Sequence, residues 1–314
     1  MRLPDPWIVA GDGQVRLDEL GGRPCGSGRE HRRSRHVRPE RRIAALTHLV
    51  GESGHVGRGA SDDQRHLGGP LERSGEQVVG ALWPGEPSLR LPVGLRVGVG
   101  QVQGSWATGV GKDGEPVVLE DSGGDVVGHG TACAGIVRSL APDCELYSVR
   151  VLGAGYTGSG TVLLAGLQWA VEHGFDVINM SLSTTKRQFA SVLHELADSA
   201  YFRRTVLVAS AHNMPVESFP WRFSSVISVG SHELDDPLTL FYNPSPPVEF
   251  FARGVNLDVA WLGGSTLRVT GNSFATPHVT GFCALVRGKH PELTPFQLKN
   301  VLHLISDNVR PRDE

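Results

Sequence analysis

Short apolar runs alternate with amphipathic stretches after about residue 92, and this alternation most strongly limits the fold. Runs rich in β-branched residues predict strands at 95–99, 144–152, 176–182, 206–209 and 226–229. A helical stripe over 161–173 stops at Gly174, and Thr294 to Gln297 forms a capping box that opens a second helix. Strands that alternate with helices predict an α/β fold, a mostly parallel sheet covered by helices on both faces.

The first 92 residues differ from the rest of the chain. They hold 14 Arg and no Lys, and seven of these arginines lie between Arg29 and Arg42. Such a stretch buries too little apolar surface to offset its ordering entropy, so we predict a poorly structured segment, 1–92, before a folded domain, 93–314. A propeptide and a nucleic-acid-binding arm are the alternatives. A further hypothesis is that this Arg-, Gly- and Pro-rich composition reflects a wrong reading frame of GC-rich DNA.

The stretch TGNSFATPHVTG, residues 270–281, places Ser273 among small residues just before an apolar run. Pro277 is easily accommodated in a first helical turn, where its missing N–H would have no partner. We therefore expect Ser273 at the N-terminus of a helix. Free N–H groups and the positive end of the helix dipole would favour a nucleophile and its oxyanion there.

Two further segments carry groups that would complete a nucleophilic site. His129 lies between glycines in GHGTACAGI, and the small residues after it would let a helix pack closely and leave the imidazole facing a cleft. Asn213 follows the apolar run 206–209, where its amide could donate to an oxyanion beside the N–H of Ser273. The structural alternatives are a buried histidine without a role and a turn-forming asparagine.

Two segments are candidates for binding an extended peptide. Ser181, Leu182 and Ser183 follow the strand DVINM and could pair with a peptide backbone. The loop that contains Gly153 and Gly155 could supply the opposite wall.

Three of these segments, GHGTACAGI, SLS after DVINM and GNSFATPHV, resemble in this order the subtilisin-like serine proteases, or subtilases. The resemblance covers about residues 93–306 and implies a three-layer subtilisin-like fold. It implies a serine endopeptidase with Ser273 as nucleophile, His129 as general base and acid, and Asn213 in the oxyanion hole. The chain departs from the family pattern at His212 and Ser183, where glycine is usual. Structural calcium is known in the family, but the sequence identifies no calcium site and no other cofactor.

The family's catalytic aspartate has no clear counterpart. The predicted strand 95–99 is followed by Gln101 where an aspartate would be expected. Asp121 in VVLEDSG has the right local pattern but lies only eight residues before His129. Asp121 is the tentative triad acid, with Asp113, Asp125 or no acid at all as alternatives. A catalytically inactive, peptide-binding subtilase-like protein is therefore the alternative function.

Other classes are less well supported. The run GAGYTG, residues 153–158, has the spacing of a dinucleotide-binding loop with Asp176 downstream, and His129 and Cys133 have the spacing of two metal ligands. A net charge of −3 with 20% charged residues gives no strong attraction to nucleic acid or membrane, so we predict neither as a partner. The predicted partner is a peptide or protein substrate. Cys133, Cys144 and Cys283 lie in apolar runs and indicate buried free thiols. With no recognisable signal peptide the expected location is cytoplasmic, or secreted if the true N-terminus differs.

Overall fold

The computed structural model describes residues 42–47, 101–121, 124–153 and 158–309 of the 314-residue chain. All of them belong to one compact unit that extends from Arg38 to Glu314. Among these residues, no helix is long and apolar enough to cross a membrane.

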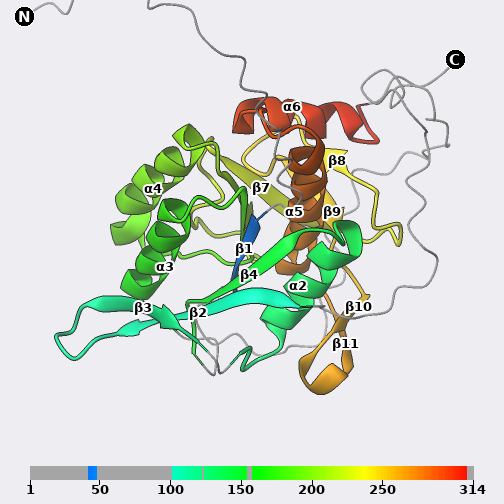
Figure 1. Cartoon of the computed structure of the whole chain (residues 1–314). Coiled ribbons are helices and arrows are strands. Elements are labelled where there is room, and N and C mark those ends of the chain that lie inside the picture. Colours follow the sequence, from blue (N-terminus) through cyan, green and yellow to red (C-terminus); the bar gives the residue numbers. More distant parts are fainter. Residues whose placement is uncertain (1–41, 48–100, 122–123, 154–157, 310–314) are drawn as a thin grey trace, which may run out of the picture. The chain divides into compact units, whose positions relative to one another are not determined.

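A nine-stranded sheet forms the centre of this unit, in the order β3-β2-β4-β1-β5-β6-β7-β9-β8 (Figure 1). Neighbouring strands from β2 through β9 all pair in parallel, while β3 and β8 pair antiparallel at the two edges. The strand bounds are β1 Arg42–Thr47, β2 Val102–Val110, β3 Pro116–Glu120, β4 Glu145–Arg150, β5 Val177–Met180, β6 Val206–Ser210, β7 Val226–His232, β8 Phe241–Tyr242 and β9 Phe250–Arg253. A separate antiparallel hairpin joins β10, Leu257–Ala260, to β11, Thr266–Val269.

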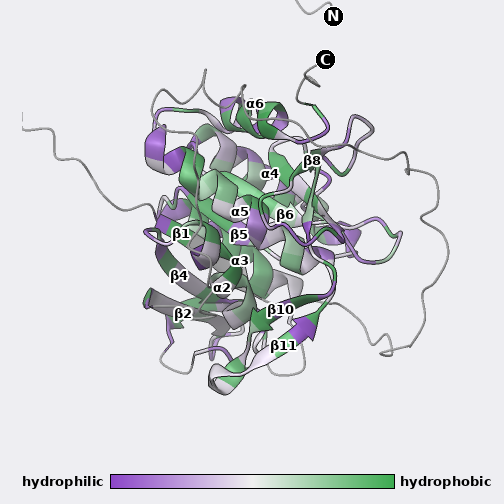
Figure 2. Cartoon of the chain, turned by 90° about the vertical axis from the view of Figure 1, so that its right-hand side faces the viewer, coloured by the Kyte–Doolittle hydropathy of each residue, from purple (hydrophilic) through white to green (hydrophobic). Residues whose placement is uncertain are grey.

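Helices cover both faces of the sheet, as expected for parallel strands that are apolar on both sides. On one face α2, His129–Leu140, packs against α5, Asn272–Lys289, with α6, Pro295–Ile305, beside it. On the other face lie α3, Gly160–Glu172, and α4, Ala190–Phe202. Figure 2 shows hydrophobic residues concentrated on the central strands and on the helices against them. The predicted three-layer α/β fold is confirmed.

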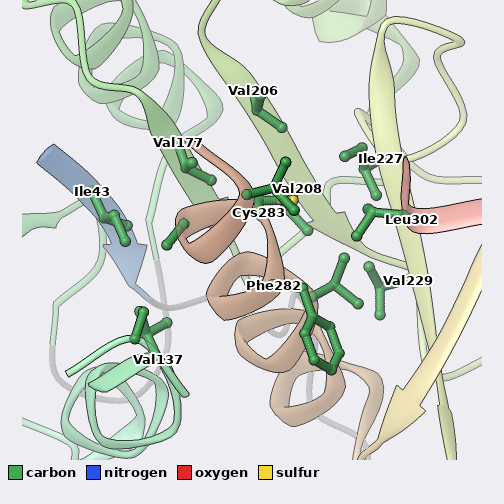
Figure 3. Packing of buried hydrophobic residues seen from close by; sticks show 14 of the residues in the cluster. Ile43, Val137, Val177, Val206, Val208, Ile227, Val229, Phe282, Cys283 and Leu302 are labelled. Atoms are coloured by element: carbon green, nitrogen blue, oxygen red, sulfur yellow. The ribbon is translucent and has the colours of Figure 1, made fainter. Parts of the chain in front are cut away.

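The larger core cluster lies between the sheet and the layer of α2, α5 and α6. Figure 3 shows Val137 of α2, Phe282 and Cys283 of α5 and Leu302 of α6 facing the strands. All four side chains are buried, and Val137, Cys283 and Leu302 are completely so. This packing fixes α2 and α5 against the same sheet face, and their N-termini carry the candidate catalytic groups.

Most elements predicted after residue 92 are present. The predicted strands 144–152, 176–182, 206–209 and 226–229 correspond to β4, β5, β6 and β7, and the helix 161–173 corresponds to α3. The capping box of α6 is also present: the side chain of Thr294 accepts from Gln297 N–H, and that of Gln297 accepts from Thr294 N–H. The strand expected at 95–99 lies outside the described residues.

The N-terminal segment differs from its prediction at one place. Arg42–Thr47, within the predicted poorly structured segment 1–92, form β1 between β4 and β5. Parallel pairing on both edges provides the hydrogen bonds that make these six residues a strand, and Ile43 is fully buried. The rest of 1–92 lies outside the described residues, so its state and the boundary at residue 92 stay predictions.

Pro277 lies one turn farther into α5 than the sequence suggested. It is the sixth residue of the helix, where a normal residue would donate its N–H to the carbonyl of Ser273. The helix continues through this position, and Cys133 Sγ of α2 lies 3.7 Å from Ser273 O. Cys133, Cys144 and Cys283 are buried free thiols, as predicted.

His278 makes the stability of this fold depend on pH. It is 3% exposed in α5, and its Nδ1–H donates to Phe274 O at 2.9 Å. Burial, opposed by that hydrogen bond, lowers the pKa of His278 from 6.5 to about 4. Between these two pH values the unfolded chain binds the proton more readily than the folded chain. The contribution of His278 to the free energy of unfolding is therefore complete above pH ~6.5 and is lost as the pH falls to ~4, a change on the order of 3 kcal/mol.

Urea unfolding between about pH 7 and pH 4.5 measures this effect. We expect the urea midpoint of His278→Gln to fall less steeply than that of the wild type as the pH decreases. His194→Gln removes a histidine whose side chain is 52% exposed, and its urea midpoint should change with pH as steeply as that of the wild type. Identical slopes for all three proteins would contradict the assignment to His278.

Candidate active site

The candidate residues converge on one edge of the sheet. Parallel strands end at the same edge, and ligands of open α/β sheets bind outside these carboxyl ends. Ser181–Ser183 follow β5, and Asn213 follows β6. His129 is the first residue of α2, and Ser273 is the second residue of α5. The two helices pack together on one face of the sheet.

Cys133 connects His129 to the start of α5. Its Sγ lies 3.5 Å from His129 Nδ1, 3.4 Å from Ser181 Oγ and 3.7 Å from Ser273 O. Burial raises the pKa of this thiol to about 12, so it is neutral at physiological pH. His129 is 9% exposed as a residue, and its ring packs against Phe274 with ring centroids 4.9 Å apart. His129 and Ser273 are therefore neighbours through a shared contact, although they are 144 residues apart in sequence.

Asp125 holds the chain that leads into α2. Its carboxylate accepts hydrogen bonds from Val127 N–H, Gly128 N–H and both the N–H and the hydroxyl of Thr131, at 2.7–3.0 Å. Burial by itself would raise the pKa of Asp125, but these hydrogen bonds outweigh it and lower the pKa. The N-cap of α2 is Gly128, and Asp125, three residues earlier, binds both the N–H of Gly128 and the first-turn N–H of Thr131 on either side of His129.

Gly271 faces a space shared by the two oxyanion candidates. A Cβ on Gly271 would lie 3.5 Å from Ser273 Oγ and 3.6 Å from Asn213 Nδ2. Ser273 is the second residue of α5, so its N–H has no partner within the helix. The serine hydroxyl and the Asn213 amide thus border one small region.

The orientation of the Asn213 amide follows from its hydrogen bond. Asn272 N–H lies 3.0 Å from the side-chain oxygen of Asn213, and a backbone N–H can only donate. The oxygen is therefore the atom bound to Asn272, and the NH₂ group points to the Gly271 side. His212, which replaces the family's usual glycine, accepts the N–H of Met214 at its Nδ1 and closes the turn after β6.

The candidate substrate segment is buried on its side-chain face. Ser181 and Leu182 are each 1% exposed, and Ser181 Oγ accepts from Asn179 Nδ2. Farther along, Thr184 pairs with Phe219 through two backbone hydrogen bonds of 2.9 Å. A Cβ on Gly153 would meet no atom within 4 Å, so space is open there. Gly155 lies outside the described residues.

The candidate acids have other partners. Asp121 follows β3, and its carboxylate accepts from Arg150 of β4 at 2.9 and 3.0 Å. Asp113 is in the exposed turn between β2 and β3 and accepts from Glu115 N–H. The strand next to both β4 and β5 is β1, which ends at Thr47 and has no acidic residue among RIAALT.

Within the part of the chain that the structure describes, the groups of the two rival sites do not come together. Asp176 accepts from Arg42 N–H at the amino end of β1 and β5, the sheet edge opposite the loop after β4. It is thus far from the position that a ribose-binding acid would need beside Gly153 and Gly158. Over the described ranges, no group of three or more His, Cys, Asp and Glu residues could hold a metal ion.

Sequence reasoning did not identify two residues of this site. Asn272 ties Asn213 to α5, and Cys133 joins His129 to Ser273 and Ser181. An asparagine just before a serine at a predicted helix start was a usable signal for Asn272. The role of Cys133 follows only from the packing of α2 against α5.

Comparisons with known proteins show which family the chain resembles. A model described as the subtilase family matches residues 103–309. Subtilisin Savinase of Lederbergia lenta is 34% identical over 194 residues, which cover 58% of this chain and 71% of that protein. An alkaline protease of Alkalihalobacillus alcalophilus is equally identical, but only 50% of it is covered.

Solved structures with a similar fold include subtilisin-like proteins. A cold-adapted subtilisin-like serine proteinase is 26% identical with a TM-score of 0.50, covering 62% of this chain and 72% of that chain. Sphericase shares the fold at 22% identity with a TM-score of 0.54, covering 65% and 76% of the two chains.

Gly128 provides a test of how His129 is positioned. Its φ is +103°, and a Cβ there would lie 2.4 Å from the indole of Trp261, between β10 and β11. We expect Gly128→Ala to lower the free energy of unfolding by roughly 3 kcal/mol, from backbone strain and this clash. Gly124→Ala is the matched control, because Gly124 also has a positive φ, +67°, but has no atom within 4 Å of its Cβ position. Equal losses in urea unfolding would show that Trp261 does not constrain the start of α2.

Proposed function

The chain belongs to the subtilase family of serine endopeptidases, and on this premise we propose that it hydrolyses peptide bonds by acyl transfer to Ser273. In the proposed mechanism, His129 is the general base and acid, and Asn213 and the Ser273 N–H form the oxyanion hole. The observation that carries the proposal is the Asn213 amide, whose oxygen is bound by Asn272 N–H so that its NH₂ borders the same space as Ser273 Oγ.

The chemistry follows from these positions. Ser273 Oγ attacks the scissile carbonyl carbon while His129 Nε2 takes the hydroxyl proton. We assign this role to Nε2 because Nδ1 lies beside Cys133 Sγ. The new negative charge falls on the carbonyl oxygen, where Asn213 Nδ2–H and Ser273 N–H donate to it. His129 then passes its proton to the leaving amine, and water hydrolyses the acyl-enzyme through the same two steps.

The other parts of the site are proposed from family resemblance. Ser181, Leu182 and Ser183 would align the substrate backbone, with Gly153 and Gly155 opposite. Peptides and proteins are the proposed substrates. A cytoplasmic or a secreted location stays a prediction, as does bound calcium.

The triad acid remains a proposal as well. Asp121 is the candidate from the sequence, and its Oδ2 accepts from the Arg150 guanidinium at 2.9 and 3.0 Å. Losing the acid's charge lowers turnover by ~10⁴, while the oxyanion hole and substrate binding retain part of the acceleration.

The ion pair between Asp121 and Arg150 favours a second candidate function, an inactive subtilase-like protein that binds peptides. Such a protein would keep the peptide-binding segments but bind peptides without cleaving them. The two candidate functions differ in whether Ser273 is reactive, and both involve peptides as the bound molecules.

A fluorophosphonate probe distinguishes these functions, because it labels only a serine whose hydroxyl is activated. We expect the wild type to be labelled, Ser273→Ala to show no labelling, and His129→Ala to be labelled far more slowly. Gel fluorescence and mass spectrometry of the labelled peptide give the readout. Labelling of Ser273→Ala equal to wild type would refute the nucleophile, and an unlabelled wild type would favour the peptide-binding protein.

The oxyanion space can be tested by filling it. Because a Cβ on Gly271 would make ordinary van der Waals contacts of 3.5–3.6 Å, Gly271→Ala should fold normally while its methyl group enters the space proposed for the oxyanion. We expect the rate of labelling or of peptide cleavage to fall by roughly 100-fold, as when an oxyanion donor is lost. Gly288→Ala, near the other end of α5, where no atom lies within 4 Å, is the control and should retain the rate. Unchanged rates in Gly271→Ala would place the oxyanion elsewhere.

A further inference from the structure

Asn272, the residue before the proposed nucleophile, has every polar atom of its side chain in use. Its Oδ1 accepts from Ser231 N–H at 3.0 Å and from the Ser231 hydroxyl at 2.9 Å. Its Nδ2 donates to Ala211 O at 3.2 Å and to His212 O at 3.3 Å. Only one orientation of the amide satisfies a backbone N–H on one side and two carbonyls on the other, so this side chain is fixed in one position.

These bonds join the loop after β6, the end of β7 and the start of α5. Ala211 and His212 follow β6 and lead directly into Asn213, and Ser231 lies near the end of β7. The backbone N–H of Asn272 adds the bond to the side-chain oxygen of Asn213. Residue 272 thus holds the Asn213 loop at both its backbone and its side chain, and holds this loop against the start of α5.

We infer that Asn272 is a positioning residue of the proposed protease, which sets the distance between the Asn213 amide and Ser273. The inference rests on the proposed function. Asn272 acts through Asn213: its own amide is committed to Ser231 and to the two carbonyls and is not available to the oxyanion. A polar group that only stabilised the fold would need no link to the one loop that carries the oxyanion donor.

The sequence explains how this arrangement forms. Ala211 is buried, and its N–H donates to Val229 O of β7, so the loop leaves β6 in a fixed direction. The carbonyls of Ala211 and His212 then face α5, where a buried carbonyl without a donor would be costly. The amide of Asn272 supplies both donors, whereas an aliphatic side chain would supply none.

A double-mutant cycle tests this role, because a residue that acts through another loses its effect when the other is removed. We expect Asn213→Ala to lower kcat by ~10²–10³. Asn272→Ala should lower kcat by roughly 10- to 100-fold with KM changed by less than about threefold, since misplacing a catalytic group affects the transition state more than substrate binding. In the Asn213→Ala background, Asn272→Ala should cost less than about threefold.

Ser231→Ala is the matched control. It removes one of the two donors to Asn272 Oδ1 and leaves the bonds to the Asn213 loop, so kcat should stay within about threefold of wild type. If Asn272→Ala lowers kcat by the same factor with and without Asn213, Asn272 does not act through Asn213 and the inference is wrong. An unchanged kcat in Asn272→Ala would also overturn it.

A second measurement does not depend on activity. Asn272→Asp retains the acceptor for Ser231 but presents a carboxylate to the carbonyls of Ala211 and His212. Hydrogen exchange followed by mass spectrometry should show faster exchange in the 211–214 segment than in wild type, with the strands of the sheet unchanged. Unchanged exchange in 211–214 would overturn the inference. An unlabelled wild type in the fluorophosphonate test would instead refute the proposed protease. The hydrogen-exchange result for Asn272→Asp would still show whether Asn272 holds the 211–214 segment in place.

Discussion

The parallel alignment of the central strands is the constraint on which the site depends. Strands that run the same way bring the segments after β5 and β6 to one edge of the sheet. Burial on both faces then requires two helical layers, and the layer of α2 and α5 points two helix N-termini at that edge. The histidine and serine segments, far apart in sequence, meet because each begins a helix that packs on the same sheet face.

Much of this arrangement could be predicted from local patterns. A buried parallel strand is apolar on both sides, so runs such as VINM and VLVAS stand out without alternation. The capping box of α6 and the small residues around Ser273 likewise specify helix starts. β1 escaped prediction because its state depends on pairing with β4 and β5, and a short run beside a cluster of arginines gives no local sign of two partner strands.

The contacts that orient the candidate groups could not be predicted in the same way. A motif specifies that an asparagine follows β6, but the direction of its amide depends on Asn272 N–H, 59 residues later in the chain. Likewise, Cys133 fits the small-residue pattern of α2, yet its position beside His129 Nδ1 and Ser273 O depends on helix packing. The acidic residues show the same limit. Asp125 binds backbone N–H groups at the start of α2 and Asp121 pairs with Arg150, and sequence spacing alone does not distinguish these contacts.

The acid is what separates the two proposed functions. Serine, histidine and an oriented oxyanion donor are sufficient for some acceleration, because stabilising the tetrahedral oxyanion does not require the acid. The acid adds a fixed imidazole tautomer and a charge opposite the imidazolium. In this chain the thiol of Cys133, neutral and next to Nδ1, can accept a hydrogen bond and hold the ring, but it cannot supply that charge. Asp121, whose Oδ2 accepts from the Arg150 guanidinium, is the acid that the active-protease proposal assigns to supply this charge.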